Sequence, residues 1–279
     1  MITVRCMVDN TVLRGSALWG EHGVAFWIET PHGNLLFDTG QSGEVLVHNA
    51  ELMHVDLRYC DSLVLSHAHY DHTGGLEQFF NFSRQRIPLY ASPNLFRERY
   101  SIREGEPHSI GLRMSKDNIH ARSTLHLSIE PLEIMPGIWT TGEILERLDF
   151  EGRSPQHFIR IDETWQPDPY QDDLSLVLHT SQGLVIICGC CHAGILNTLK
   201  HVRLMVDKDI TAIIGGIHLA NADTEILEYT IAKICTINKH ETPYLYLNHC
   251  SGENAMVAFR QAFKEKMRSC LAGTVLMFT

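Results

Sequence analysis

Three histidines and an aspartate lie within six positions in the segment His67-Ala-His69-Tyr-Asp71-His72. His67 and His69 are two residues apart at the end of the apolar run 61–66, so in a strand both imidazoles would project to the same side. Asp71 and His72 follow where the chain turns into a helix and could serve a second cation. These ligand types suit a borderline ion such as Zn²⁺, Fe²⁺ or Mn²⁺. A polar turn rich in histidine by chance is the alternative, but the number and order of ligand-type residues favour a metal site.

Later histidines follow apolar stretches of strand length. The carboxyl ends of parallel strands meet at one edge of a sheet, which is where α/β proteins place their chemistry. We therefore expect His192, His218 and His249 to approach one another, after strands near 184–188, 211–214 and 244–247.

The elements that must position these residues suggest two sheets. Strands dominate residues 1–66 and again 128–188, and each block is followed by alternating strands and helices, which favours two sheets face to face with helices outside. We predict one domain over 1–279, with a lid or insertion around 93–122. Strands are expected at 3–8, 25–29, 34–37, 61–66, 87–91, 128–131, 138–141, 174–179, 184–188, 211–214, 244–247 and 275–278, and helices at 42–51, 75–80, 195–206, 224–237 and 253–267.

Composition excludes several classes of function. The chain has 23 Lys+Arg against 33 Asp+Glu, a formal charge of −10, which disfavours nucleic acid and anionic membranes as partners. No apolar run approaches the roughly 18 residues of a membrane helix, and no signal peptide is evident. Eight cysteines in 279 residues do not suggest a disulfide framework, so we expect a reducing cytoplasm.

The spacing His-x-His-x-Asp-His resembles that of the metallo-β-lactamase superfamily. Further motifs are similar to its dihydropteroate-synthase-like branch, and the resemblance extends from about residue 20 to 252. It implies an α/β fold, a four-layer αββα sandwich with metals at one edge between the sheets. The motifs are Glu21-His22-Gly23, Thr141-Gly142-Glu143, Asp172-Asp173, Gly189-Cys190-Cys191-His192, Gly215-Gly216-Ile217-His218 and Asn248-His249-Cys250-Ser251-Gly252.

The resemblance also implies a ligand set for one or two divalent transition metals, with zinc favoured and iron or manganese as alternatives. Asp38 matches a residue that orients a ligand and the metal loop. Whether His218 or His249 is the last ligand depends on how the strands are counted, and we favour His249. The expected ligands are His67, His69 and His192 for one ion, and Asp71, His72 and His249 for the other.

The sequence departs from the superfamily at Cys190, where relatives commonly place a metal-bridging aspartate after glycine. A thiolate or a water could take that place, so Cys190 is a candidate ligand. The segment Cys188-Gly-Cys-Cys191 is also a Cys-x-x-Cys pattern, which could indicate redox chemistry. Small buried residues beside a metal explain it better.

These residues predict a metal-dependent hydrolase that uses a metal-bound hydroxide on a small anionic substrate: a phosphate ester, phosphodiester or lactone. Asp71 would bind metal and orient water, and His218, backed by Glu143 or Asp173, would protonate the leaving group. The resemblance implies an alternative, a transferase joining a dihydropterin diphosphate to an aminobenzene ribofuranosyl phosphate with loss of diphosphate. A ribonuclease-like enzyme and a non-enzymatic sensor are further alternatives, which the negative charge and the intact metal motif respectively disfavour.

Overall fold

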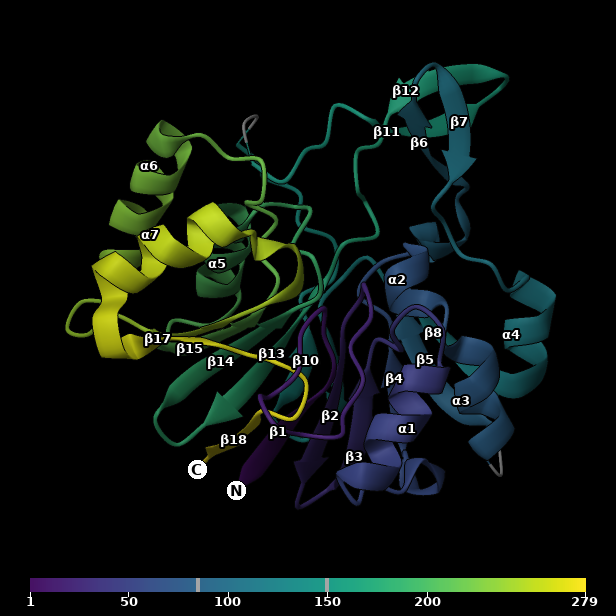
Figure 1. Ribbon diagram of the computed structural model, residues 1–279, viewed down its shortest axis with the longest axis horizontal. Helices are drawn as coiled ribbons and strands as arrows, with labels where there is room; N and C mark the ends of the chain where they lie inside the picture. The colour runs from purple at the N-terminus through teal and green to yellow at the C-terminus, as the bar shows by residue number, and fades with distance from the viewer. Residues whose placement is uncertain (84–85, 149–150) are drawn as a thin grey trace.

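Two seven-stranded sheets face each other at the centre of the computed structural model, which describes residues 1–83, 86–148 and 151–279. Helices cover the outer face of each sheet, so the layers are αββα, as the sequence predicts (Figure 1). In spatial order the first sheet contains β18 (Val275–Phe278), β1 (Ile2–Val8), β2 (Ala25–Thr30), β3 (Gly33–Phe37), β4 (Ser62–Val64), β5 (Ile87–Ala91) and β8 (Ser123–Leu127).

The second sheet supplies the strands that precede the later histidines. Its strands β14 to β17 run parallel, so their carboxyl ends lie at one edge. In spatial order it contains β17 (Met267–Ser269), β16 (Tyr244–Leu247), β15 (Ile210–Gly215), β14 (Gly183–Cys188), β13 (Ser175–Thr180), β10 (Ile138–Thr140) and β9 (Leu132–Met135).

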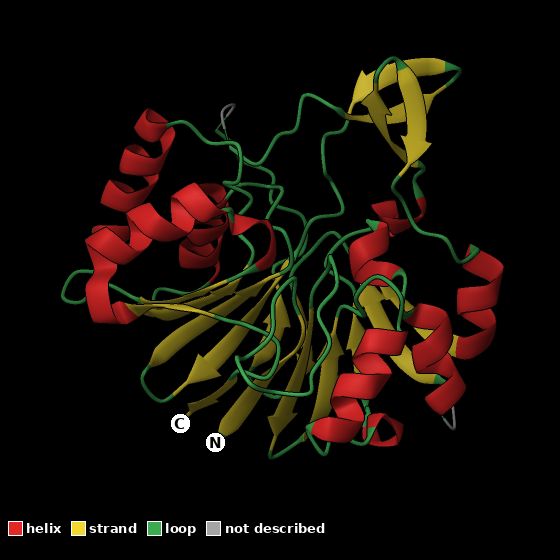
Figure 2. Cartoon of the chain, in the orientation of Figure 1, coloured by secondary structure: helices red, strands yellow, loops and turns green. Residues whose placement is uncertain are grey.

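Helices pack on the outer faces, as Figure 2 shows. Leu36 packs with the helices on the first sheet, whereas its neighbours Leu35 and Phe37 on β3 pack against the second sheet. A strand buried on both faces explains why this segment is an uninterrupted apolar run. The first sheet carries α1 (Glu44–Leu52), α3 (Leu76–Phe82) and α4 (Lys116–Arg122), and the second carries α5 (Ile195–Met205), α6 (Thr224–Cys235) and α7 (Glu253–Phe263). Among the described residues, no helix is both long and apolar enough to cross a membrane.

A third, four-stranded sheet stands beyond the strand ends of the sandwich (Figure 1). It combines two segments far apart in the chain, of which the sequence analysis singled out only 93–122. Its outer strands are fully exposed and carry no apolar alternation, so sequence patterns give no signal for them. The strands, in spatial order, are β12 (Thr164–Pro167), β11 (His157–Ile161), β6 (Arg99–Arg103) and β7 (Glu106–Ser109).

One predicted strand is wrong, and one predicted helix is too long. Residues 128–131 form a turn between β8 and β9 rather than a strand, because the Ser128 hydroxyl accepts a hydrogen bond from the Glu130 N–H and Pro131 follows. The last helix ends at Phe263 rather than at residue 267, because Lys264 takes a φ of 52° and redirects the chain into β17.

Arg99, the first residue of β6, anchors the third sheet. Its buried guanidinium forms ion pairs with Asp168 at 3.0 Å and Asp172 at 2.6 Å. The other oxygen of Asp172 accepts a hydrogen bond from the Ala68 N–H at 2.8 Å. The same carboxylate therefore fixes the third sheet and the segment between His67 and His69.

We predict that Arg99→Met destabilises the protein by about 3–5 kcal/mol, because it leaves two buried carboxylates without a countercharge. Chemical denaturation measures the change in the free energy of unfolding. Arg58→Met is the matched control: its pair with Asp56 lies at the surface, so its loss changes stability little. Equal unfolding midpoints for the two variants would contradict the anchoring role of Arg99.

Candidate metal centre

The loop that carries the histidine motif follows β4 and leads into the short helix α2 (Tyr70–Thr73). Asp38, fully buried after β3, holds both ends of this loop. Its Oδ1 accepts a hydrogen bond from the Ser66 N–H at 2.7 Å, and its Oδ2 accepts from Ser66 Oγ and from His72 Nδ1, each at 2.7 Å. The structure thus places Asp38 where it orients His72 and the loop.

His67, His69 and His192 converge from the loop and from the end of β14; we call them the His67 set. Nε2 of His192 lies 3.2 Å from Nδ1 of His69, and Nε2 of His67 is buried without a hydrogen-bond partner among the described residues. Two nitrogens bound tetrahedrally to one zinc ion would be about 3.3 Å apart. The arrangement fits a shared ion.

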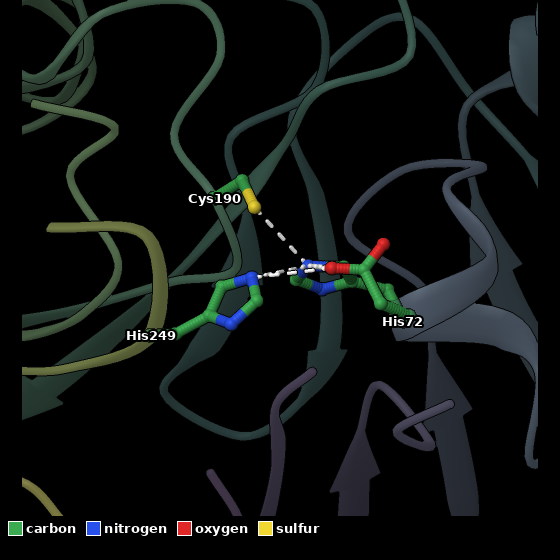
Figure 3. Close-up of side chains that lie close together, drawn as sticks. His72, Cys190 and His249 are labelled. Carbon is green, nitrogen blue, oxygen red and sulfur yellow. Dashed lines mark hydrogen bonds and ion pairs between the residues drawn. The ribbon is translucent and has the colours of Figure 1, made fainter. Parts of the chain in front are cut away.

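Asp71, His72, Cys190 and His249 form a second group, the His72 set (Figure 3). Nε2 of His72 lies 3.1 Å from Cys190 Sγ and 3.2 Å from His249 Nε2. Asp71 Oδ2 lies 3.5 Å from the His72 nitrogen and 3.3 Å from that of His249. One imidazole nitrogen carries at most one proton, so hydrogen bonds cannot satisfy all these contacts. A cation between the four side chains would.

The outer ring nitrogens of the His72 set are held in place. Nδ1 of His72 donates to Asp38, and Nδ1 of His249 donates to Asn10 Oδ1 at 3.0 Å. The His249 backbone N–H also donates to Asp9 Oδ1 at 2.9 Å. These acceptors leave the Nε2 lone pairs facing the set, which is how metal-binding imidazoles are usually oriented.

Burial and charge set the protonation of the two sets differently. Burial first, and then the neighbouring imidazoles, lower the pKa of His67 and of His192 well below the ordinary value, so both rings are neutral at pH 7. Burial also disfavours charge on His72, but Asp71 and Asp38 outweigh it and raise its pKa to about 9. An ion entering the His72 set therefore displaces a proton, and its affinity falls as the pH falls.

The remaining candidate residues are His218, Asp173 and Glu143, which the sequence predicts as a proton donor and its supporting carboxyl groups. His218 lies beside the His67 set, its ring centroid 4.2 Å from that of His192. Asp173 is buried, and its Oδ2 accepts a hydrogen bond from the Ala193 N–H. The Glu143 N–H donates a hydrogen bond to the Ile129 carbonyl at 2.8 Å, in the segment that follows β10, and its role behind His218 stays a prediction.

Only one cysteine of the Cys-x-x-Cys pattern faces the two sets. Cys188 Sγ contacts Ser175 Oγ at 3.5 Å, and Cys191 Sγ contacts Thr198 Oγ1 at 3.3 Å, both away from His72. Cys190 alone contacts His72. Cys188 and Cys191 are free thiols that contact each other, and this contact together with burial raises the pKa of Cys191, which disfavours the thiolate that redox chemistry requires.

Several residues near the sets were given no role from the sequence, although His22 lies in one of the motifs that carry the resemblance. Nε2 of His22 lies 3.3 Å from Asp71 Oδ2, at the exposed side of the His72 set. Tyr170 stacks on His192 with ring centroids 4.4 Å apart, and its hydroxyl bonds His157 Nδ1 at 2.9 Å. Asn10 follows the end of β1, so the strand-end rule that located the later histidines could have located it too.

We predict that Cys190→Asp keeps the fold and raises the Mn²⁺ occupancy relative to the wild type. A carboxylate in the His72 set would replace a soft ligand with the oxygen that Mn²⁺ prefers. A metal titration and a melting curve measure the two properties. If Cys190 is only a core residue, the substitution instead buries an unpaired carboxylate, and stability falls while the metal preference stays the same.

Comparisons with known proteins agree with this geometry. Residues 18–92 match the family model of the metallo-beta-lactamase superfamily. Over 99% of this chain and 97% of the relative, the sequence is 30% identical to the 7,8-dihydropterin-6-methyl-4-(beta-D-ribofuranosyl)-aminobenzene-5'-phosphate synthase of Methanocaldococcus jannaschii. An uncharacterised protein of the same organism is 26% identical over 92% of this chain and 94% of its own length.

Solved structures share the fold. A crystal structure of a metal-dependent hydrolase of the beta-lactamase superfamily has a TM-score of 0.85 and 24% identity, covering 100% of both chains. Zn(2+)-bound PqqB from Methylobacterium extorquens has a TM-score of 0.59 and 10% identity, covering 99% of this chain and 100% of its own. The chain therefore belongs to the metallo-beta-lactamase superfamily, in the branch that contains the archaeal synthase.

Proposed function

We propose that this protein is a metal-dependent hydrolase of a small anionic substrate: a phosphate ester, a phosphodiester or a lactone. The observation that carries the proposal is that two ligand sets lie side by side, with the rings of His67 and His72 4.2 Å apart between centroids. Divalent ions, zinc above all, fit these nitrogen, oxygen and sulfur ligands and would supply Lewis-acid activation of water and of a phosphoryl or carbonyl oxygen.

In this proposal Asp71 holds and orients a water molecule. Although burial disfavours its charge, the neighbouring His72 and His249 lower its pKa below the ordinary value, so the carboxylate stays ionised. Its Oδ2 already lies 3.3 Å from His22 Nε2 on the exposed side of the His72 set. A water there would find a charged acceptor next to the ion positions.

In this proposal His218 gives a proton to the leaving group. Burial works against its charged form, but Cys250, with Asp173 and Asp71, raises the pKa of the imidazole above its ordinary value. The direction of this shift favours the protonated ring that a general acid requires. Burial raises the pKa of Asp173 to about 7, so this carboxyl group can exchange a proton near neutral pH.

Aromatic rings pack around the His67 set. Tyr170 lies parallel to His192, with 2° between the ring planes, and His157 lies edge-on to His69. Such rings exclude water and offer faces to a flat substrate. These rings, and the synthase relative that is 30% identical over nearly the full length, support a second candidate function. It is the transfer of a dihydropterin group from its diphosphate to an aromatic acceptor.

The two candidates differ in their need for an acceptor. We would incubate the protein, loaded with two zinc ions per chain, with a dihydropterin diphosphate, with and without the aminobenzene ribofuranosyl phosphate, beside a panel of phosphoesters and lactones. If the protein is a hydrolase, we expect turnover of a phosphoester or a lactone, or release of diphosphate without the acceptor. Diphosphate release that depends on acceptor and yields the joined product would replace the hydrolase proposal with the transferase. No turnover of any substrate would refute both.

We predict that His218→Ala lowers kcat by roughly 10²–10⁴-fold, the usual contribution of a positioned general acid. The ions of the His67 and His72 sets should remain, because neither set includes His218. Steady-state kinetics and elemental analysis of the same preparation give both numbers. A fall below two ions per chain would identify His218 as a ligand of one of these sets rather than as the acid.

A further inference from the structure

A third group of ligand-type side chains adjoins the two sets, and of its members only Cys190 belongs to a set described above. Cys190 Sγ, Cys250 Sγ and a ring nitrogen of His218 all lie within 4.8 Å of one another; we call these residues the thiol set. They come from the ends of β14, β15 and β16, three adjacent parallel strands. The thiol set shares Cys190 with the His72 set.

The backbone conformation around residues 216 and 249–251 brings Cys250 close to Cys190. After β16 the chain makes a 3-10 turn over His249–Ser251, which directs His249 into the His72 set and places Cys250 beside Cys190. Cys250 Sγ donates a hydrogen bond to the Cys190 carbonyl at 3.4 Å. A Cβ at Gly216 would lie only 2.5 Å from Cys250 Sγ, so the absence of a side chain at residue 216 lets the thiol approach.

The thiol set also contains an unsatisfied polar atom. Nδ1 of His218 is buried without a hydrogen-bond partner among the described residues. Burying an imidazole nitrogen without a partner is costly, unless a ligand completes it. Two thiols and an imidazole form a Cys₂His group, one of the ligand combinations that bind zinc with a fourth position left open.

We propose that Cys190, His218 and Cys250 form a third metal position, selective for thiophilic ions such as Zn²⁺, with the Cys190 thiolate shared with the His72 set. Binding deprotonates the two thiols and releases their protons to solvent. The sulfur ligands make this position softer than the nitrogen-only His67 set, so it disfavours Mn²⁺.

Occupancy of the third position has one consequence that rests on the proposed function. A ring nitrogen of His218 that ligates an ion cannot also donate a proton to a leaving group. Zinc beyond two equivalents should therefore inhibit turnover. The ion count itself does not depend on any activity.

The test is a zinc count and a cobalt titration on the full chain. Wild-type protein saturated with Zn²⁺ and dialysed should hold three ions, and Cys250→Ser should hold two. In the Co²⁺ titration the third equivalent should add thiolate-to-metal charge-transfer absorbance in the wild type but not in Cys250→Ser. Cys191→Ser is the matched control: this adjacent buried thiol faces Thr198, so the variant should behave as the wild type.

A second variant separates loss of a ligand from loss of the fold. His218→Ala removes the ligand supplied by another strand and should also cost one ion, while circular dichroism shows native secondary structure. The proposal is overturned if the wild type holds no more than two ions, or if either variant retains three. Inactivity of the protein at two zinc ions per chain would count against the proposed function and leave this inference standing.

Discussion

The buried carboxylate of Asp38 is the interaction on which the metal centre depends. It binds the Ser66 backbone, the Ser66 hydroxyl and the His72 ring at once, and so fixes the loop from both ends. Ser66 Oγ in turn contacts His67 Nδ1 at 2.8 Å, so one carboxylate orients a ligand in each set. Asp38 itself has a φ of 60°, a conformation uncommon for residues other than glycine. Strain of this kind is typical of functional sites that surrounding contacts hold in place.

The second sheet completes the centre because its strands are parallel. His192, His218 and His249 follow β14, β15 and β16, and the last two take a φ of 49° as the chain turns away from the sheet. The third sheet is tied to the same place through Arg99 and Asp172. The histidine loop, the strand ends of the second sheet and the third sheet thus meet around one buried group of imidazoles. Burial lowers the pKa of His67 and so keeps its ring neutral.

The sequence predicted the parts that depend on local pattern. The strands at 87–91, 244–247 and 275–278 have the predicted bounds, and the ligand-type residues of the two sets follow strands that apolar runs reveal. Exposed strands such as β12 carry no such pattern. The position of Cys250 depends on the 3-10 turn over His249–Ser251 and on the absence of a side chain at Gly216. The Glu143 backbone is held by its hydrogen bond to the Ile129 carbonyl. These are tertiary relations that no local pattern encodes.

The central claim is that two ligand sets hold adjacent ions. Anomalous diffraction from crystals of the zinc-loaded protein, recorded on either side of the zinc absorption edge, tests it most directly. The account predicts one peak among His67, His69 and His192 and another among Asp71, His72, Cys190 and His249, about 3.5–4 Å apart as in other two-metal sites. A fully loaded protein with no peak in either set, or with zinc bound only at surface residues, would contradict it.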